Sequence, residues 1–226
     1  MAATVKDFAA AADNDGGFTF DMTGLSHVSG DLGVASVGTL GSTGLTYSGW
    51  TALHDTANGT SCECSSAYKA LDGTETSLSC SSAQSKGVGL IYIVEGHADP
   101  STDPPEVTVT TGSSANPDPP SHTPSGGSDD YLIIAPEVHT FLATVSAWPS
   151  GYDGTGSQAT SAGSACTMGY AHDSITGTSE NPGAYTISFS NDWVSPTISV
   201  APAAVAAGSL IASRIGSMVY RHMLVR

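Results

Sequence analysis

Two short, strongly apolar runs stand out from a chain that is otherwise polar and rich in glycine. One is Gly87 to Val94 and the other is Trp193 to Val200. Each is rich in β-branched and aromatic residues, too short for a typical helix, and flanked by polar or glycine residues. Such runs are typical of strands buried on both faces of a sheet, so we predict a β-strand at each.

The segments that precede the two runs follow the same order. In the first half they are a strand at Asp31–Val37, Ser48-Gly49-Trp50, a half-buried strand at Cys62–Lys69, a turn at Asp72–Glu75 and a strand at Thr76–Ser82. In the second half they are a strand at Asp129–Ile134, Ser150-Gly151-Tyr152, a strand at Ala165–Tyr170, a turn at Gly177–Glu180 and a strand at Tyr185–Phe189. This order predicts two tandem related β-units. Chance alignment among abundant Gly, Ser and Thr residues is the alternative.

The expected fold is all-β, an antiparallel β-sandwich of jelly-roll or Ig-like type with a C-terminal arm. Its expected parts are an N-terminal arm with a first strand (1–29), a first β-unit (30–96), a Pro-rich connector (97–126), a second β-unit (127–202) and an apolar, basic arm (203–226). The connector is expected to carry one edge strand, Val107–Thr110. Two small domains remain an alternative, but each unit offers only about five strands, which favours a single sandwich.

Charge limits the possible partners. The net charge is -15 and the sequence pI is near 4.4, which argues against nucleic acid and anionic membranes as partners. The N-terminus lacks the apolar core of a signal peptide, and no apolar stretch is long enough to span a bilayer. We therefore expect neither classical secretion nor membrane insertion.

The last residues differ from the rest of the chain. Three of the six basic residues are Arg214, Arg221 and Arg226, and no acidic residue follows Asp192. The apolar residues among them fit either a helix or a strand. We predict that this arm docks on other subunits, because an exposed apolar segment needs a covering surface; packing on its own core is the alternative. The predicted docking residues are Leu210, Ile211, Arg214, Ile215, Met218, Val219, Tyr220, Arg221, Leu224 and Arg226.

Motifs of known catalytic chemistry are missing. Gly154-Thr155-Gly156 begins a dinucleotide-like pattern, but it lies in an expected Gly/Ser/Thr loop rather than between a strand and a helix. Histidines beside acidic residues could hold a metal or act in acid–base chemistry, yet they are scattered and fit strand ends. We therefore predict no catalytic residues, no cofactor and no metal. The four histidine–acid pairs of the sequence are His54-Asp55, Glu95 with His97, Glu137 with His139, and His172-Asp173.

Other residues allow more than one interpretation. The four cysteines are expected to be buried thiols, with a bridge from Cys80 to Cys62 or Cys64 as the alternative. Asn58-Gly59 predicts a hairpin turn. Trp148 and Tyr152 are candidate ligand-contact aromatics, for example for a glycan, although Tyr152 also fits a core anchor.

Several short motifs together resemble β-sandwich proteins encoded among the virion genes of tailed bacteriophages. They are Gly30-Asp31-Leu32, Ser48-Gly49-Trp50, Tyr68-Lys69, Asp72-Gly73-Thr74-Glu75 and Leu90 to Val94. The resemblance covers residues 30 to about 200. It implies a non-enzymatic structural protein of the virion, most naturally a capsid decoration (cement) protein, that assembles as a homo-oligomer with capsid or tail subunits. A tail-associated or receptor- or glycan-binding virion protein is the alternative. A third hypothesis, which rests on the histidine and aspartate residues and not on the resemblance, is a metal-dependent hydrolase.

Overall fold

The computed structural model describes residues 2–14, 18–42, 44–81, 86–161 and 165–204. Within these ranges the regular structure consists of β-strands, and every strand pairing is antiparallel. The prediction of an all-β antiparallel fold is confirmed. No helix in the described ranges is long and apolar enough to cross a membrane.

Two large sheets form the body of the molecule. The first large sheet has the order β1 (Thr4–Asp13), β8 (Gly87–Glu95), β3 (Leu32–Leu40), β6 (Cys62–Ala70) and β5 (Thr51–Asn58). The second has the order β9 (Glu106–Ser114), β16 (Asn191–Val200), the pair β10 (Asp129–Ile134) and β11 (Glu137–Thr140), β14 (Cys166–Gly177) and β13 (Asp153–Ala159). β10 and β11 act as one strand interrupted at Pro136, because both pair with β14 and with β16.

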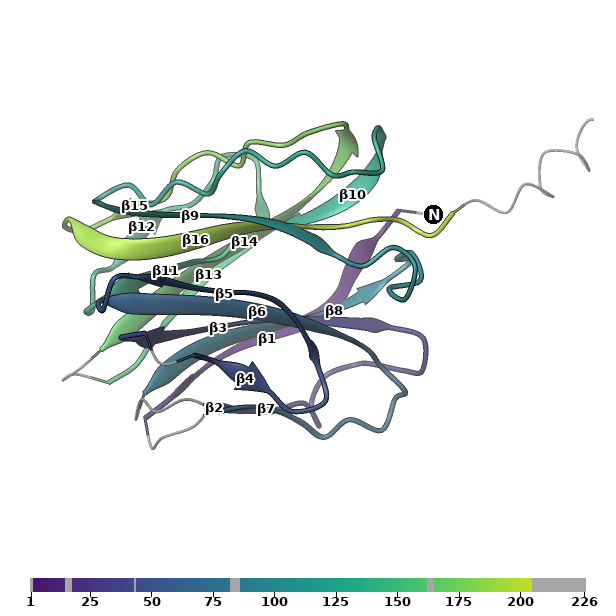
Figure 1. Cartoon of the computed structure of the whole chain (residues 1–226), viewed down its shortest axis with the longest axis horizontal. Helices are drawn as coiled ribbons and strands as arrows, with labels where there is room; N and C mark the ends of the chain where they lie inside the picture. Colours follow the sequence, from purple (N-terminus) through teal and green to yellow (C-terminus); the bar gives the residue numbers. More distant parts are fainter. Residues whose placement is uncertain (1, 15–17, 43, 82–85, 162–164, 205–226) are drawn as a thin grey trace, which may run out of the picture.

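A small sheet covers the outer face of each large sheet. The first contains β2 (Phe18–Asp21), β7 (Ser77–Ser81) and β4 (Thr46–Tyr47), and the second contains β12 (Val145–Ala147) and β15 (Thr186–Ile187). Figure 1 shows the β2-β7-β4 sheet at the bottom of the molecule and β12 and β15 in its upper left part. Both faces of each large sheet are therefore covered, which explains why the runs Gly87 to Val94 and Trp193 to Val200 are almost wholly buried, as predicted.

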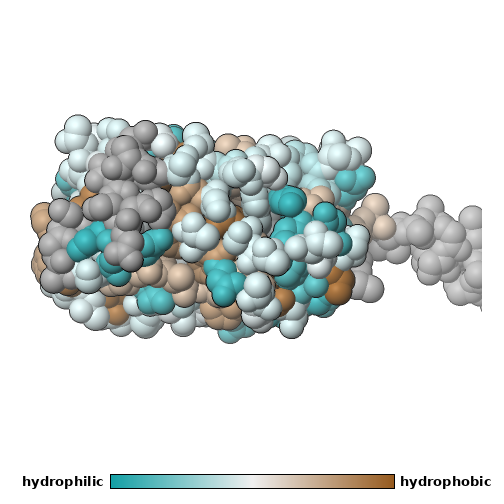
Figure 2. All heavy atoms as spheres, turned by 90° about the horizontal axis from the view of Figure 1, so that it is seen from below, coloured by the Kyte–Doolittle hydropathy of each residue, from teal (hydrophilic) through white to brown (hydrophobic). Residues whose placement is uncertain are grey.

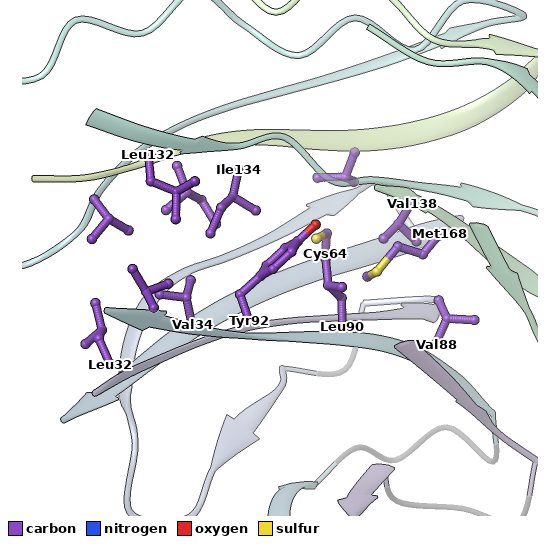
Figure 3. Close-up of a cluster of buried hydrophobic side chains, with 14 of the residues drawn as sticks. Leu32, Val34, Cys64, Val88, Leu90, Tyr92, Leu132, Ile134, Val138 and Met168 are labelled. Carbon is purple, nitrogen blue, oxygen red and sulfur yellow. The ribbon is translucent and has the colours of Figure 1, made fainter. Parts of the chain in front are cut away.

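The central core lies between the two large sheets. Leu32, Val34, Leu90 and Tyr92 from the first sheet face Leu132, Ile134, Val138 and Met168 from the second (Figure 3). Two further clusters fill the spaces under the small sheets, one around Phe20 and Ile91 and the other around Ile133 and Tyr185. Burial of these three apolar layers is the main force that holds the sheets together.

The two large sheets have the same strand order, and they contact each other through equivalent residues. Leu40 pairs with Cys62, and Thr140 pairs with Cys166 at the corresponding place in the other sheet. The Cys62 thiol lies 3.9 Å from the Val138 carbonyl and 3.5 Å from the Asp192 carbonyl, and the Cys166 thiol donates to the Gly38 carbonyl at 3.6 Å. Gly38 and Val138 also meet directly, since a Cβ on Gly38 would lie 2.4 Å from Val138 Cγ2. The first sheet thus contacts the second in nearly the same way as the second contacts the first.

Several strands differ from the sequence-based predictions. The Ala-rich start forms β1, residues 51–58 form β5, and the glycine-rich residues 153–159 form β13 instead of the expected loop. Glycine is needed in β13 because a Cβ on Gly154 would overlap the His172 ring and one on Gly156 would overlap the Tyr170 ring. The prediction that the Cys62 strand is half-buried is wrong: its first six residues are buried, since sheets cover both of its faces.

The turns and the cysteines agree with the sequence. Asn58-Gly59 turns between β5 and β6, with Gly59 at a φ of 58° and the Ser61 amide donating to the Asn58 carbonyl. The expected edge strand at Val107–Thr110 lies within β9, at the edge of the second large sheet. All four cysteines are free, buried thiols, and the alternative of a bridge from Cys80 is wrong. Cys80 pairs in a small sheet, whereas Cys62 and Cys64 belong to a large one.

The molecule has two distinct ends. At the terminal end, Thr4 pairs with Glu95, and His97 bridges to Pro202, so the described chain enters and leaves close together. At the opposite end, here called the pocket end, β3 and β11 finish and β16 begins. Figure 1 places the pocket end at the left and the terminal end at the right.

Candidate functional site

The structure locates some of the predicted site residues but not the arm. The predicted docking residues Leu210, Ile211, Arg214, Ile215, Met218, Val219, Tyr220, Arg221, Leu224 and Arg226 lie outside the described residues, so their role stays a prediction.

Trp148 and Tyr152 both pack against the cluster under the β12–β15 sheet. The Trp148 Nε1–H donates to the Gly156 carbonyl at 2.8 Å, and the Tyr152 hydroxyl donates to Glu180 Oε1 at 3.2 Å. Tyr152 is only 9% exposed. These contacts account for both side chains as structural anchors, and their contact with a ligand stays a prediction.

The histidine–acid pairs are spread over the molecule. His54 and Asp55 are neighbours on β5 with different partners: His54 Nε2 lies 3.0 Å from Ser66 Oγ, whereas Asp55 Oδ2 accepts the Leu45 amide at 3.2 Å. Burial lowers the pKa of His54 to about 4. Among the described residues, nowhere do three His, Cys, Asp or Glu side chains gather as a metal site would require.

A pocket of about 520 Å³ opens at the pocket end, between the two large sheets. We call it the end pocket. Its wall is mostly apolar or weakly polar and contains one carboxylate, Asp192. The Ser61 hydroxyl donates to Asp192 Oδ2 at 2.6 Å. Both halves of the chain contribute to the wall, which consists of Leu40, Gly41, Thr60, Ser61, Thr140, Phe141 and Asp192.

Phe141 has an unusual backbone conformation. Its φ is 63°, and it is the one residue other than glycine with a positive φ in the described part of the chain. Gly41 occupies the corresponding place after β3, with a φ of 85°. Their amides make corresponding hydrogen bonds, from Gly41 to the Ser61 carbonyl at 3.0 Å and from Phe141 to the Ala165 carbonyl at 2.7 Å. The same turn therefore occurs twice, and only the second copy bears the strain of a side chain, about 1–2 kcal/mol.

The Phe141 ring contributes to an exposed apolar surface. Phe141 is 60% exposed, Leu142 44% and Phe189 49%, three of the five large hydrophobic residues that are exposed in the described ranges. Their two loops are joined, because the Ser188 amide donates to the Thr144 carbonyl at 3.0 Å. We call these three residues the apolar end patch. In Figure 2, which shows the molecule from below, most surface atoms are pale or teal, and brown atoms are scattered over the face and at both of its ends.

The loop that carries Phe141 and Leu142 is held by a buried charged pair. His139 donates from Nδ1 to Glu137 Oε2 at 2.9 Å and from Nε2 to the Ala143 carbonyl at 3.0 Å. Glu137 Oε1 also accepts the Gly169 amide at 3.0 Å, and both charged side chains are fully buried. Burial alone would lower the pKa of His139, but the Glu137 carboxylate and the Ala143 carbonyl outweigh it, and the pKa is raised.

Further hydrogen bonds fix the Phe141 loop and the loop that follows Gly41. The Thr167 hydroxyl donates to the Phe141 carbonyl at 3.0 Å. In the loop that follows Gly41, the Gly44 amide donates to Glu63 Oε1 at 3.0 Å, and the Leu45 amide donates to Asp55 Oδ2 at 3.2 Å. Desolvation and the neighbouring Glu63 carboxyl raise the pKa of Asp55 to about 6. The end pocket therefore has both of its loops tied to the sheets beneath them.

Sequence reasoning did not find the apolar end patch. Phe141 and Leu142 follow the Glu137-Val138-His139 segment and, in sequence, could simply continue it. The available signal was the comparison of the two halves, since the spacing that relates Leu32 to Leu132 also relates Gly41 to Phe141. A phenylalanine at the position of a turn glycine indicates that the side chain is retained for a reason other than local folding.

A scan against protein-family models, a search of curated proteins and a search of solved structures each found no match.

Proposed function

We propose that this chain is a non-enzymatic structural protein that docks on neighbouring protein subunits through its apolar end patch. The patch carries the proposal: three large apolar side chains are exposed on two hydrogen-bonded loops, and one of them, Phe141, also lines the end pocket. Exposed apolar groups of this kind, next to a polar rim, are typical of protein–protein contact sites.

The way the loop is built supports a docking role. Phe141 is kept in a strained conformation, and its amide, its carbonyl and the Ala143 carbonyl all have hydrogen-bond partners. A loop whose backbone is fixed before contact loses little conformational entropy when a partner covers it. Aromatic side chains in such positions commonly supply a large share of the binding energy.

The resemblance to virion proteins of tailed bacteriophages suggests the partners. It supports a capsid decoration protein, or a tail component, whose neighbours are capsid or tail subunits. An acidic body, in a chain with a net charge of -15, would stay soluble on the outside of such a particle. The matched strand order and the Gly38–Val138 contact further support an origin by tandem duplication, after which the second unit acquired the exposed loop.

Particle assembly tests the proposal. Virions are assembled with the wild-type chain or with Phe141→Gly combined with Leu142→Ser, and the copies per particle are measured by quantitative mass spectrometry. We expect occupancy to fall at least ten-fold, because about 4 kcal/mol of hot-spot contact is removed. Val28→Ser is the matched control, since Val28 is 55% exposed but lies in the β2–β3 loop, away from the patch. Unchanged occupancy of the double variant would contradict the proposal.

A further inference from the structure

We propose that the end pocket receives the C-terminal segment 205–226 of a second copy of this chain, so that copies join head to tail. This inference rests on the proposed function and names the partner of the same site. The end pocket combines apolar walls at Leu40 and Phe141 with one carboxylate, Asp192. A matching partner would present apolar side chains with cations among them.

The segment 205–226 has this chemistry. It contains Arg214, Arg221 and Arg226, and none of the 21 acidic residues of the chain. Between the arginines lie Ile215, Met218, Val219 and other apolar residues that require a covering surface. The rest of the chain holds all of the acidic residues and only three basic ones, so segment and body attract each other electrostatically.

The position of the segment favours a second copy over the same copy. Residue 204 lies at the terminal end, and the end pocket lies at the other end of β16. The ten residues of β16 cover about 33 Å, so about ten extended residues would be used to reach the pocket of the same copy. On that path Leu210, Ile211 and Arg214 would lie along the side of the molecule and would not be available to dock in the pocket. A neighbouring copy placed head to tail meets the segment directly, with all of these residues free to dock.

Such a contact is heterologous, because the pocket of one copy meets the C-terminal segment of the next. Contacts of this kind produce rings or open filaments instead of closed two-fold dimers. Each copy then has one free pocket and one free segment until it is incorporated. The inference therefore gives an expected assembly, a head-to-tail series, that can be measured in solution.

Complementation between two full-length variants tests the inference. Phe141→Gly removes the pocket wall, and the fold should tolerate it because Gly41 adopts the same turn. Ile215→Asp damages the segment. By analytical ultracentrifugation, the wild-type chain should form concentration-dependent oligomers and each variant alone should be monomeric. An equimolar mixture of the two variants should form a one-to-one dimer, since one supplies the segment and the other the pocket.

Three results would overturn the inference. They are a monomeric wild-type chain, variants that associate as well as the wild type, or a mixture that stays monomeric. Docking of the segment within one copy would give the first of these results. Thr155→Asp, which places a charge at an exposed position in the middle of edge strand β13, between the two ends of the molecule, serves as the control and should associate like the wild type.

A peptide probe separates the pocket from other surfaces. A fluorescent peptide of residues 205–226 is titrated into the Ile215→Asp chain, whose pocket is free. Its affinity should fall at least ten-fold when Phe141→Gly is added. Asp192→Asn should weaken binding and reduce its dependence on salt, because the paired charge is lost. Equal affinity for all three chains would contradict docking in the end pocket.

The two proposals can fail separately. If Phe141→Gly lowers particle incorporation while the purified chain never self-associates, the docking function stands and the second copy is the wrong partner. If the chain self-associates through the end pocket but occupancy of particles does not change, the virion function is wrong.

Discussion

Replacing His139 by threonine tests how strongly the buried pair supports the Phe141 loop. Threonine is the residue found at the corresponding position, Thr39, of the first sheet. The variant leaves the Glu137 carboxylate fully buried without its cation. Loss of one partner from a buried ion pair costs about 3–5 kcal/mol, and the Ala143 carbonyl also loses its donor.

The companion variant is Glu137→Val, after Val37 of the first sheet. It leaves the Gly169 amide without its carboxylate acceptor, which costs about 1–3 kcal/mol, and lets His139 become neutral. The double variant has no uncompensated charge. We therefore expect it to be no less stable than His139→Thr alone, so that the pair shows a coupling free energy of at least about 1–3 kcal/mol, the cost of Glu137→Val by itself.

Urea unfolding of the wild type, the two single variants and the double variant measures this double-mutant cycle. The midpoints are compared at equal m-values, which keeps the comparison to changes in stability. If the double variant loses the full sum of the two single effects, the two side chains do not stabilise each other, and our account of the loop is wrong.

The same pair predicts a dependence on pH. The pKa of His139 is raised in the folded protein from its ordinary value near 6.5. The stabilisation is therefore fully present below the ordinary value and is lost as pH rises through the raised one. We expect the stability difference between the wild type and the double variant to shrink as pH increases from about 6 to 9. A difference that is constant over this range would show that the charged form of His139 does not stabilise the fold.

Three other measurements check the structure. Gly38→Ala should destabilise the protein by about 1–3 kcal/mol through overlap with Val138, and Val138→Ala should partly rescue it; strict additivity would contradict the contact between the sheets. The Asp55 carboxyl should titrate near pH 6 by NMR and shift toward its ordinary value in Glu63→Gln, whereas an unshifted titration would exclude the carboxyl pair. The four cysteines should react with a thiol reagent only after unfolding, because all are buried; fast reaction of the native protein would contradict this.

The local sequence predicted the strands that are buried because most of their own residues are apolar. The runs at Gly87 to Val94 and Trp193 to Val200 are rich in apolar residues, and any fold that buries them on both faces needs them as central strands. The Asn58-Gly59 turn was equally predictable, since glycine supplies the positive φ that this hairpin needs.

The candidate site was only partly predictable. The cationic, apolar character of residues 205–226 is a property of composition, and sequence showed it directly. The end pocket and the apolar end patch depend on loops from both halves meeting at one end, which no local pattern encodes. The left-handed backbone at Phe141 is imposed by its hydrogen bond to Ala165, a residue distant in sequence.

The sequence by itself determined that this chain is a β-protein with an acidic body, and it marked the most apolar strands. The tertiary structure alone decided that Ala10 to Ala12 form a strand on β8 and that the glycines of β13 lie over the Tyr170 and His172 rings. The physical reason is that β-propensity is weak for alanine and glycine, so their conformation is set by the partner strand and by the side chains that pack on them. Those partners are brought close only by folding.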